Sequence, residues 1–110
     1  MAMNRELMKG STATMLLMLL NGRPLYGYEL IKELERKSEG TFALKEGTLY
    51  PILHAMEGED WVKAYWETVE GRKRKYYQIT DKGKRILEEK KREWALFRNA
   101  VDSVLGNGGI

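Results

Sequence analysis

The 110-residue chain contains no cysteine, and His54 is its only histidine. Without cysteine it can form neither a disulfide nor a thiolate metal site, so we expect a reducing, cytoplasmic location. A single histidine excludes metal sites that need two and leaves little for histidine-based catalysis. Since no nucleophile elbow, phosphate loop or convincing pair of acids occurs either, we expect no enzyme, no metal and no cofactor.

Long apolar runs are also missing. The run over residues 13–20 follows basic residues, as in a signal peptide, but no small-residue cleavage site comes after it. It is far shorter than the roughly 20 residues that cross a bilayer, so we interpret it as a buried helix and expect no membrane association. The chain is 43% apolar and 32% charged, which is typical of one soluble globular domain.

Charge is distributed unevenly along the chain. The net charge is +3, yet residues 71–92 hold ten basic and three acidic residues, a local net charge of +7. A basic segment on a weakly acidic body is typical of a protein that binds a polyanion. A solvated, charged helix would show the same run.

The hydrophobic periodicity predicts three helices, a two-stranded hairpin and a last long helix. Val62, Ala64 and Trp66 alternate with polar neighbours, as in a half-buried strand. "EGRKRK" then supplies a turn, and "YYQIT" a second strand. The helices are expected over residues 4–20, 26–37, 45–57 and 81–105, and the hairpin over 61–80.

This order of elements is that of a winged helix-turn-helix, a mainly α fold with a β-hairpin wing. We therefore expect a DNA-binding domain over residues 1–80, a dimerisation helix over 81–105 and a tail over 106–110. In such folds the third helix enters the major groove of DNA, and positive residues of the wing reach the phosphates.

The third helix supports this interpretation because it carries two residues that disfavour a helix, Gly47 and Pro51. Gly47 would let the helix start come close to the DNA backbone, and free N–H groups there attract phosphate. Tyr50 is expected to project outward. The DNA contacts predicted on this helix and on the wing are Lys45, Thr48, Tyr50, His54, Arg72, Lys73, Arg74 and Lys75. For His54, a solvated surface position is the alternative.

The last helix has a narrow apolar seam. Leu87, Trp94 and Val101 are spaced by seven residues, and a second row with the same spacing is interrupted by Lys90. Such a seam is suited to pairing with another helix, so we expect a homodimer to which the first helix contributes. Packing on its own domain is the alternative. The predicted interface residues are Leu7, Met15, Leu19, Leu87, Trp94, Phe97, Val101 and Val104.

Four segments together resemble the PadR family of transcriptional regulators: "LYGYELIKELE", "EGTLYPILHAME", "GRKRKYYQITDKGKRIL" and "REW". The resemblance covers about residues 10–105. The length of the chain is similar to that of the short PadR subfamily, in which one C-terminal helix mediates dimerisation. The resemblance implies a homodimeric repressor that releases a double-stranded DNA operator when a signal arrives. It also nominates Tyr26 and Tyr28 as phosphate ligands, with core or rim packing as the alternative.

Two positions depart from the family pattern. The family often has serine or asparagine where Lys45 stands, and a lysine cannot accept the N–H bonds of a helix cap. It also tends to have Gly-Leu where this chain has Asp60-Trp61. Aspartate tolerates the left-handed backbone conformation better than most residues, so we expect the turn to survive.

The family also suggests an effector site, because its multidrug-responsive members carry a tryptophan at the position matching Trp94. Two such rings would face each other across the dimer axis and stack on a small aromatic effector; simple packing is the alternative. The predicted pocket residues are Met8, Met15, Lys90, Trp94 and Phe97. A winged helix that serves only protein–protein contact is a further alternative, against which the four consecutive basic residues of the wing argue.

Overall fold

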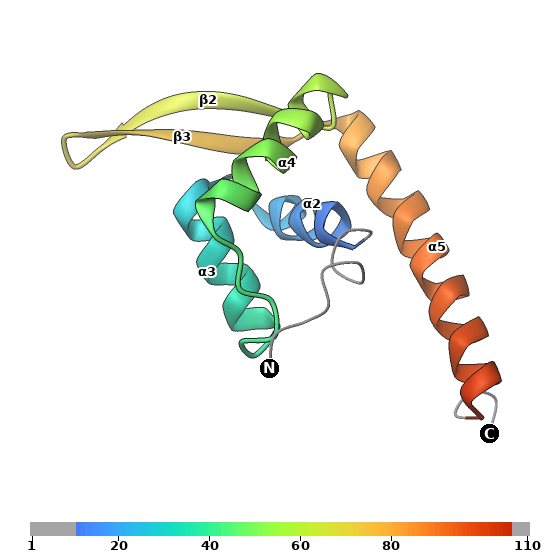
Figure 1. Ribbon diagram of the computed structural model, residues 1–110. Helices are drawn as coiled ribbons and strands as arrows, with labels where there is room; N and C mark the ends of the chain where they lie inside the picture. The colour runs from blue at the N-terminus through green and yellow to red at the C-terminus, as the bar shows by residue number, and fades with distance from the viewer. Residues whose placement is uncertain (1–10, 107–110) are drawn as a thin grey trace.

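The computed structural model describes residues 11–106. Their elements, in chain order, are α2 (Thr12–Gly22), β1 (Leu25–Tyr26), α3 (Gly27–Lys37), α4 (Glu46–Gly58), β2 (Val62–Val69), β3 (Arg72–Ile79) and α5 (Asp81–Leu105). The predicted fold, mainly α with a β-hairpin wing, is confirmed. In Figure 1, α2 and α3 lie below the hairpin, α4 runs from the start of α3 up to the base of the hairpin, and α5 extends away from the other helices.

The element boundaries agree closely with those predicted from the sequence. The helices α3 and α4 lie within one residue of their predicted limits, and α5 has the predicted limits. The first helix ends at Gly22 rather than at Leu20, and the part predicted over residues 4–10 lies outside the described residues. The strand β1 was not predicted. No helix in the described part of the chain is long and apolar enough to span a bilayer.

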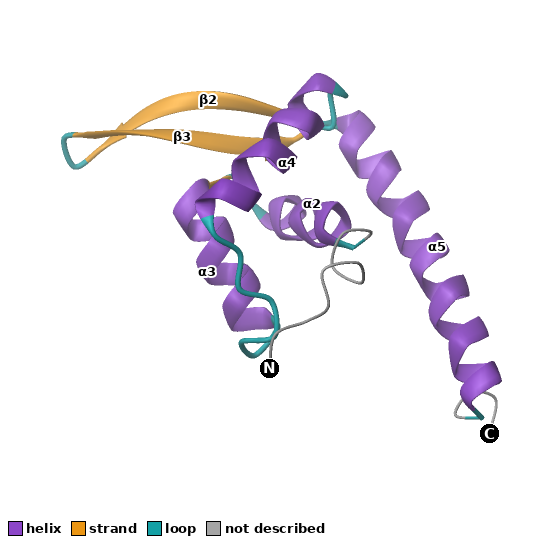
Figure 2. Ribbon diagram, viewed as in Figure 1, coloured by secondary structure: helices purple, strands orange, loops and turns teal. Residues whose placement is uncertain are grey.

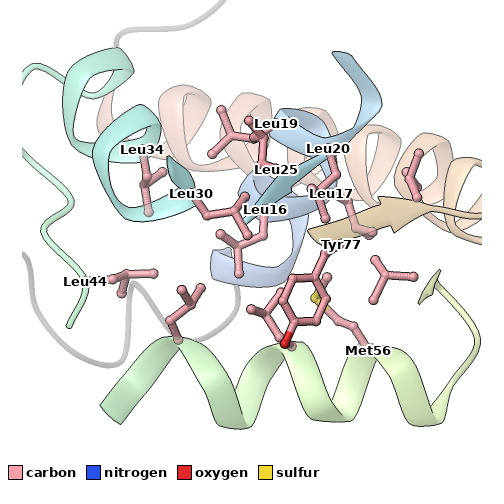
Figure 3. Close-up of a cluster of buried hydrophobic side chains, with 14 of the residues drawn as sticks. Leu16, Leu17, Leu19, Leu20, Leu25, Leu30, Leu34, Leu44, Met56 and Tyr77 are labelled. Carbon is pink, nitrogen blue, oxygen red and sulfur yellow. The ribbon is translucent and has the colours of Figure 1, made fainter. Parts of the chain in front are cut away.

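The core lies where α2, α3 and α4 meet the sheet. Leu16, Leu30 and Leu53, one from each helix, have no exposed surface. Tyr77 reaches into the same cluster from β3, with its hydroxyl directed toward α4 (Figure 3). Full burial of one such side chain contributes roughly 1.5–3 kcal/mol, so this cluster fixes the positions of α3 and α4.

The sheet is antiparallel with the strand order β1-β3-β2. The two long strands pair over their full length, from Val62↔Ile79 to Val69↔Arg72. The turn between them consists of Glu70 and Gly71, with φ of 51° and 79°, as in the type I′ turn that suits a two-residue hairpin. This hairpin is the wing, and Figure 2 shows its far end projecting beyond the helices.

The short strand β1 pairs only with the inner part of β3, through Leu25↔Tyr77 and Tyr26↔Tyr76. Farther out, β3 is paired on one side only. The wing has left the core there, and Trp66 is 65% exposed. The prediction of a half-buried face that includes Trp66 is therefore wrong for this residue.

A tight joint connects α4, β2 and α5. Thr80 Oγ1 accepts a hydrogen bond from Gly83 N–H at 2.9 Å and caps α5. The same hydroxyl donates to Asp60 O at 2.6 Å. Asp60 has φ of 62°, the left-handed conformation expected of this turn. A Cβ at Gly83 would collide with the carbonyl oxygen of Trp61, so the start of α5 needs glycine.

Candidate nucleic-acid interface

An open cleft of about 550 Å³ lies between the inner wing and the first turns of α3 and α4. Cationic and aromatic side chains line most of it. They belong to Tyr26, Tyr28, Tyr50, Trp66, Arg72, Lys73, Arg74 and Lys75; Gly27 and Glu46 complete the lining. Seven of the ten predicted DNA contacts thus come together at one site.

The other three predicted contacts lie on the exposed face of α4. Lys45, Thr48 and His54 are exposed, whereas Leu49 and Leu53 on the opposite face are fully buried. Lys45 occupies the N-cap position without a side-chain hydrogen bond, so the first N–H groups of α4 are not capped by the preceding side chain. Such N–H groups attract anions.

Tyr50 differs from its prediction. Its ring is half-buried, and its hydroxyl lies against Gly27, where a Cβ would collide with it. Tyr50 therefore does not project outward from α4 but points toward the start of α3. There it forms one wall of the cleft, and Gly27 provides the space that it occupies.

The four cations of the wing lie along β3 rather than in the turn, and their environments differ. Arg72 and Lys73, nearest the turn, are exposed. The Arg74 guanidinium lies 4.5 Å from the centre of the Tyr26 ring, close enough for a cation–π contact. Lys75 Nζ lies 5.6 Å from the Tyr77 ring centre and 3.9 Å from Glu57 Oε1. The two inner cations are thus already engaged within the chain.

The Tyr26 ring that contacts Arg74 is itself held by two further aromatic rings. Tyr26 and Tyr76 pack edge to face at 5.5 Å, and Tyr76 stacks on Tyr65 at 5.7 Å. These contacts cross all three strands, so they hold the wing against the start of α3. Tyr28, just beyond, is 57% exposed and has Lys32 Nζ 5.4 Å from its ring centre.

Glu57 of α4 is the acidic partner of Lys75, the innermost of these cations. Its Oε1 lies 3.9 Å from Lys75 Nζ and 3.9 Å from His54 Nδ1. That oxygen is buried and accepts no hydrogen bond from any described residue. Burial, then the nearby Glu57 carboxylate and Tyr50, raise the pKa of Tyr77 above its ordinary value, because each disfavours a phenolate.

The predicted dimer seam divides into two parts. Leu87 and Leu19 are 1% and 9% exposed and belong to the core of their own chain, so their assignment to a partner contact is wrong. Toward the C-terminus, by contrast, Trp94 is 49% and Phe97 55% exposed, and their rings stack on each other at 5.8 Å. Val101 and Val104 continue this exposed stripe.

The remaining residues of the predicted seam and pocket have mixed positions. Met15 is half-buried at the edge of the core. Lys90 lies with its Nζ 5.3 Å from the Trp61 ring centre, within its own chain. Leu7 and Met8 lie outside the described residues.

Sequence reasoning missed three residues of the cleft lining, Gly27, Glu46 and Trp66, and also Glu57 beside it. Trp66 was assigned to a buried face because the alternation continues past the point where the core ends. Glu57 carried no signal, since a glutamate near the end of a helix is ordinary. The four consecutive cations opposite it were the available clue, because a charge cluster of one sign favours a nearby counter-charge.

The chain is similar to known transcriptional regulators. A family model described as the transcriptional regulator PadR-like family matches residues 16–89. A transcriptional regulator from Clostridium thermocellum is 31% identical with a TM-score of 0.83, over 89% of this chain and 96% of that one. A PadR-like transcriptional regulator from Bacillus cereus is 34% identical with a TM-score of 0.80, over 91% and 96%. An uncharacterized protein of Lysinibacillus sphaericus is 35% identical over 88% of this chain and 90% of that protein.

Proposed function

The chain belongs to the PadR-like family of transcriptional regulators, and from this we propose that it is a homodimeric repressor that binds a palindromic operator and releases it on binding a small aromatic effector. The family's members regulate transcription and are not enzymes. The observation that carries the DNA-binding part is the cleft in which wing cations and the first turns of α3 and α4 meet.

In the proposed complex α4 enters the major groove with Lys45, Thr48 and His54 toward the bases and the backbone. The cleft then receives the sugar–phosphate strand beside the groove. Its cations supply sequence-independent affinity, whereas the exposed face of α4 supplies sequence preference. Tyr26 and Tyr28 lie at the edge of the cleft, where a phenol can donate a hydrogen bond to a phosphate oxygen.

Dimerisation is proposed through the exposed part of α5. Trp94, Phe97, Val101 and Val104 form one exposed stripe, which residues 11–106 do not cover. Pairing two such stripes about a two-fold axis would bury them and place two copies of α4 on two half-sites. The same stripe carries the effector proposal, in which Trp94, Phe97 and Met15 border a space that opens between the two protomers.

The DNA proposal can be tested by selecting a duplex from a random pool and measuring its affinity over a range of salt. We expect the affinity to fall steeply with salt, because bound cations release counterions from the phosphates. Replacing Arg72 and Arg74 by alanine should weaken binding to every duplex. It should also reduce the slope of log K against log salt by about 1.8, or about 0.9 for each phosphate that the variant no longer neutralises.

A matched control removes two cations that lie outside the cleft, Lys84 and Arg85 of α5. This variant should keep the parent slope. If the wing variant binds as tightly as the control, the wing is not the phosphate contact. If the parent selects no duplex at all, a winged-helix module for protein–protein contact becomes the better interpretation.

A further inference from the structure

The Glu57 carboxylate lies between the two DNA-facing elements, on α4 and beside β3. It is 3.9 Å from a cation of the wing, Lys75, and equally far from His54 on the exposed face of α4. The distance to Lys75 is too long for a hydrogen bond but within the range of an ion pair. The paired oxygen accepts no hydrogen bond from any residue between 11 and 106.

This arrangement makes the ion pair easy to break. The side chains of Lys75 and Glu57 are 32% and 30% exposed. The paired oxygen itself is buried, but a pair of this length without a hydrogen bond adds little to folding stability. A phosphate oxygen that enters the cleft can therefore compete with Glu57 for the ammonium group. Until then, Lys75 is held against α4.

We propose that Glu57 is a specificity-determining residue, which withholds Lys75 from DNA that does not fit α4 and ties the wing to that helix. The inference rests on the proposed DNA-binding function. A duplex of unrelated sequence is bound mainly through its phosphates, so binding is weaker while a carboxylate holds one of the cations. On the operator, α4 lies in the groove. Because the Lys75–Glu57 ion pair links the wing to α4, the wing is then placed correctly against the DNA backbone.

The test replaces Glu57 by glutamine, which keeps the shape of the side chain and removes its charge. For a duplex of scrambled sequence, E57Q should strengthen binding and steepen the slope of log K against log salt by about 0.9, equal to one additional neutralised phosphate. The gain at 50 mM salt should then be about 3.5-fold larger than the gain at 200 mM. The operator should gain less, so the ratio of the two affinities should fall.

Two controls separate this role from a general effect of charge. Glu59 is exposed at the end of the same helix, and E59Q removes the same charge away from the wing. In a K75Q background, the effect of Glu57→Gln on slope and on affinity ratio should disappear, because the withheld cation is gone.

The proposal is overturned if E57Q and E59Q behave alike, if the effect persists in the K75Q background, or if operator and scrambled duplex gain equally. These results differ from a failure of the DNA-binding function itself, in which the parent protein would show no salt-dependent binding to any duplex. Circular dichroism of each variant checks that the fold is retained.

Discussion

Gly47 offers a test of how closely the start of α4 approaches DNA. It is the second residue of the helix, it is exposed, and among the described residues no atom lies within 4 Å of the Cβ that alanine would add. Gly58, at the other end of α4, has the same open surroundings. Both can therefore accept alanine in the free protein without a collision.

The two substitutions should have similar effects on the free protein. Alanine is favoured over glycine by about 0.8–1 kcal/mol in a helix interior and by less near its ends. We therefore expect each of Gly47→Ala and Gly58→Ala to raise the free energy of unfolding by up to about 1 kcal/mol, with a rise of a few degrees in melting temperature.

Their effects on DNA binding should differ. If the backbone of the operator packs against Gly47, an added methyl group must be accommodated in a filled contact, which typically costs about 1–3 kcal/mol. That corresponds to roughly 5- to 150-fold weaker binding. Gly58 lies at the opposite end of the helix, so Gly58→Ala should keep the parent affinity.

Fluorescence anisotropy with a labelled operator, at one fixed salt concentration, measures this difference, and thermal melts of the free proteins run beside it. If Gly47→Ala is stabilised and also binds the operator as tightly as Gly58→Ala, DNA does not approach this part of α4. The proposed seating of the helix would then be incorrect.

Three more predictions concern the rest of the molecule. Gly83→Ala should lower the free energy of unfolding by about 3 kcal/mol, measured in urea, because the new methyl group meets backbone that cannot move aside; unchanged stability would contradict the joint described at this position. Phe97→Asp should give monomers in light scattering, whereas Leu96→Asp should leave a dimer. Leu96 comes two residues after Trp94, a rotation of about 200° around the helix axis, and therefore lies away from the stripe. Monomers in both cases, or a monomeric parent, would contradict the seam. A planar aromatic cation should quench the fluorescence of Trp94 when the other two tryptophans are phenylalanine, and Trp94→Ala should abolish the quenching while operator binding persists; quenching that survives Trp94→Ala would place the ligand elsewhere.

Much of the fold could be predicted because its signals are local. Periodicity locates α3, α4 and the hairpin, and Thr80 marks the start of α5 by its capping hydroxyl. The strand β1 has only two residues and therefore no periodicity of its own. It exists because Leu25 is drawn into the core and pairs with Tyr77, a long-range contact that no short window of sequence contains.

The site could be predicted in its residue types but less well in its geometry. The four wing cations stand out in the sequence, yet nothing local indicates that Arg74 lies over Tyr26 or that Lys75 faces Glu57. Tyr50 is turned toward α3 because a glycine there leaves room for its ring. The heptad spacing of α5 locates an apolar stripe along the helix, but spacing alone cannot show that Leu87 belongs to the chain's own core.

Because of the hydrogen bonds at Trp61, a rotation of α5 is transmitted to α4. The Trp61 carbonyl accepts from Thr80 N–H at 3.0 Å, and the Trp61 N–H donates to Met56 O at 2.9 Å, so the end of α4 and the start of α5 must move together. From Phe97 back to Asp81 the helix spans roughly 24 Å. A rotation of about 10° about Phe97 therefore displaces the joint by roughly 4 Å, more than the 3.4 Å rise of one base pair. In the proposed dimer, a tilt that small at the seam would put each copy of α4 a full base pair out of phase with its half-site.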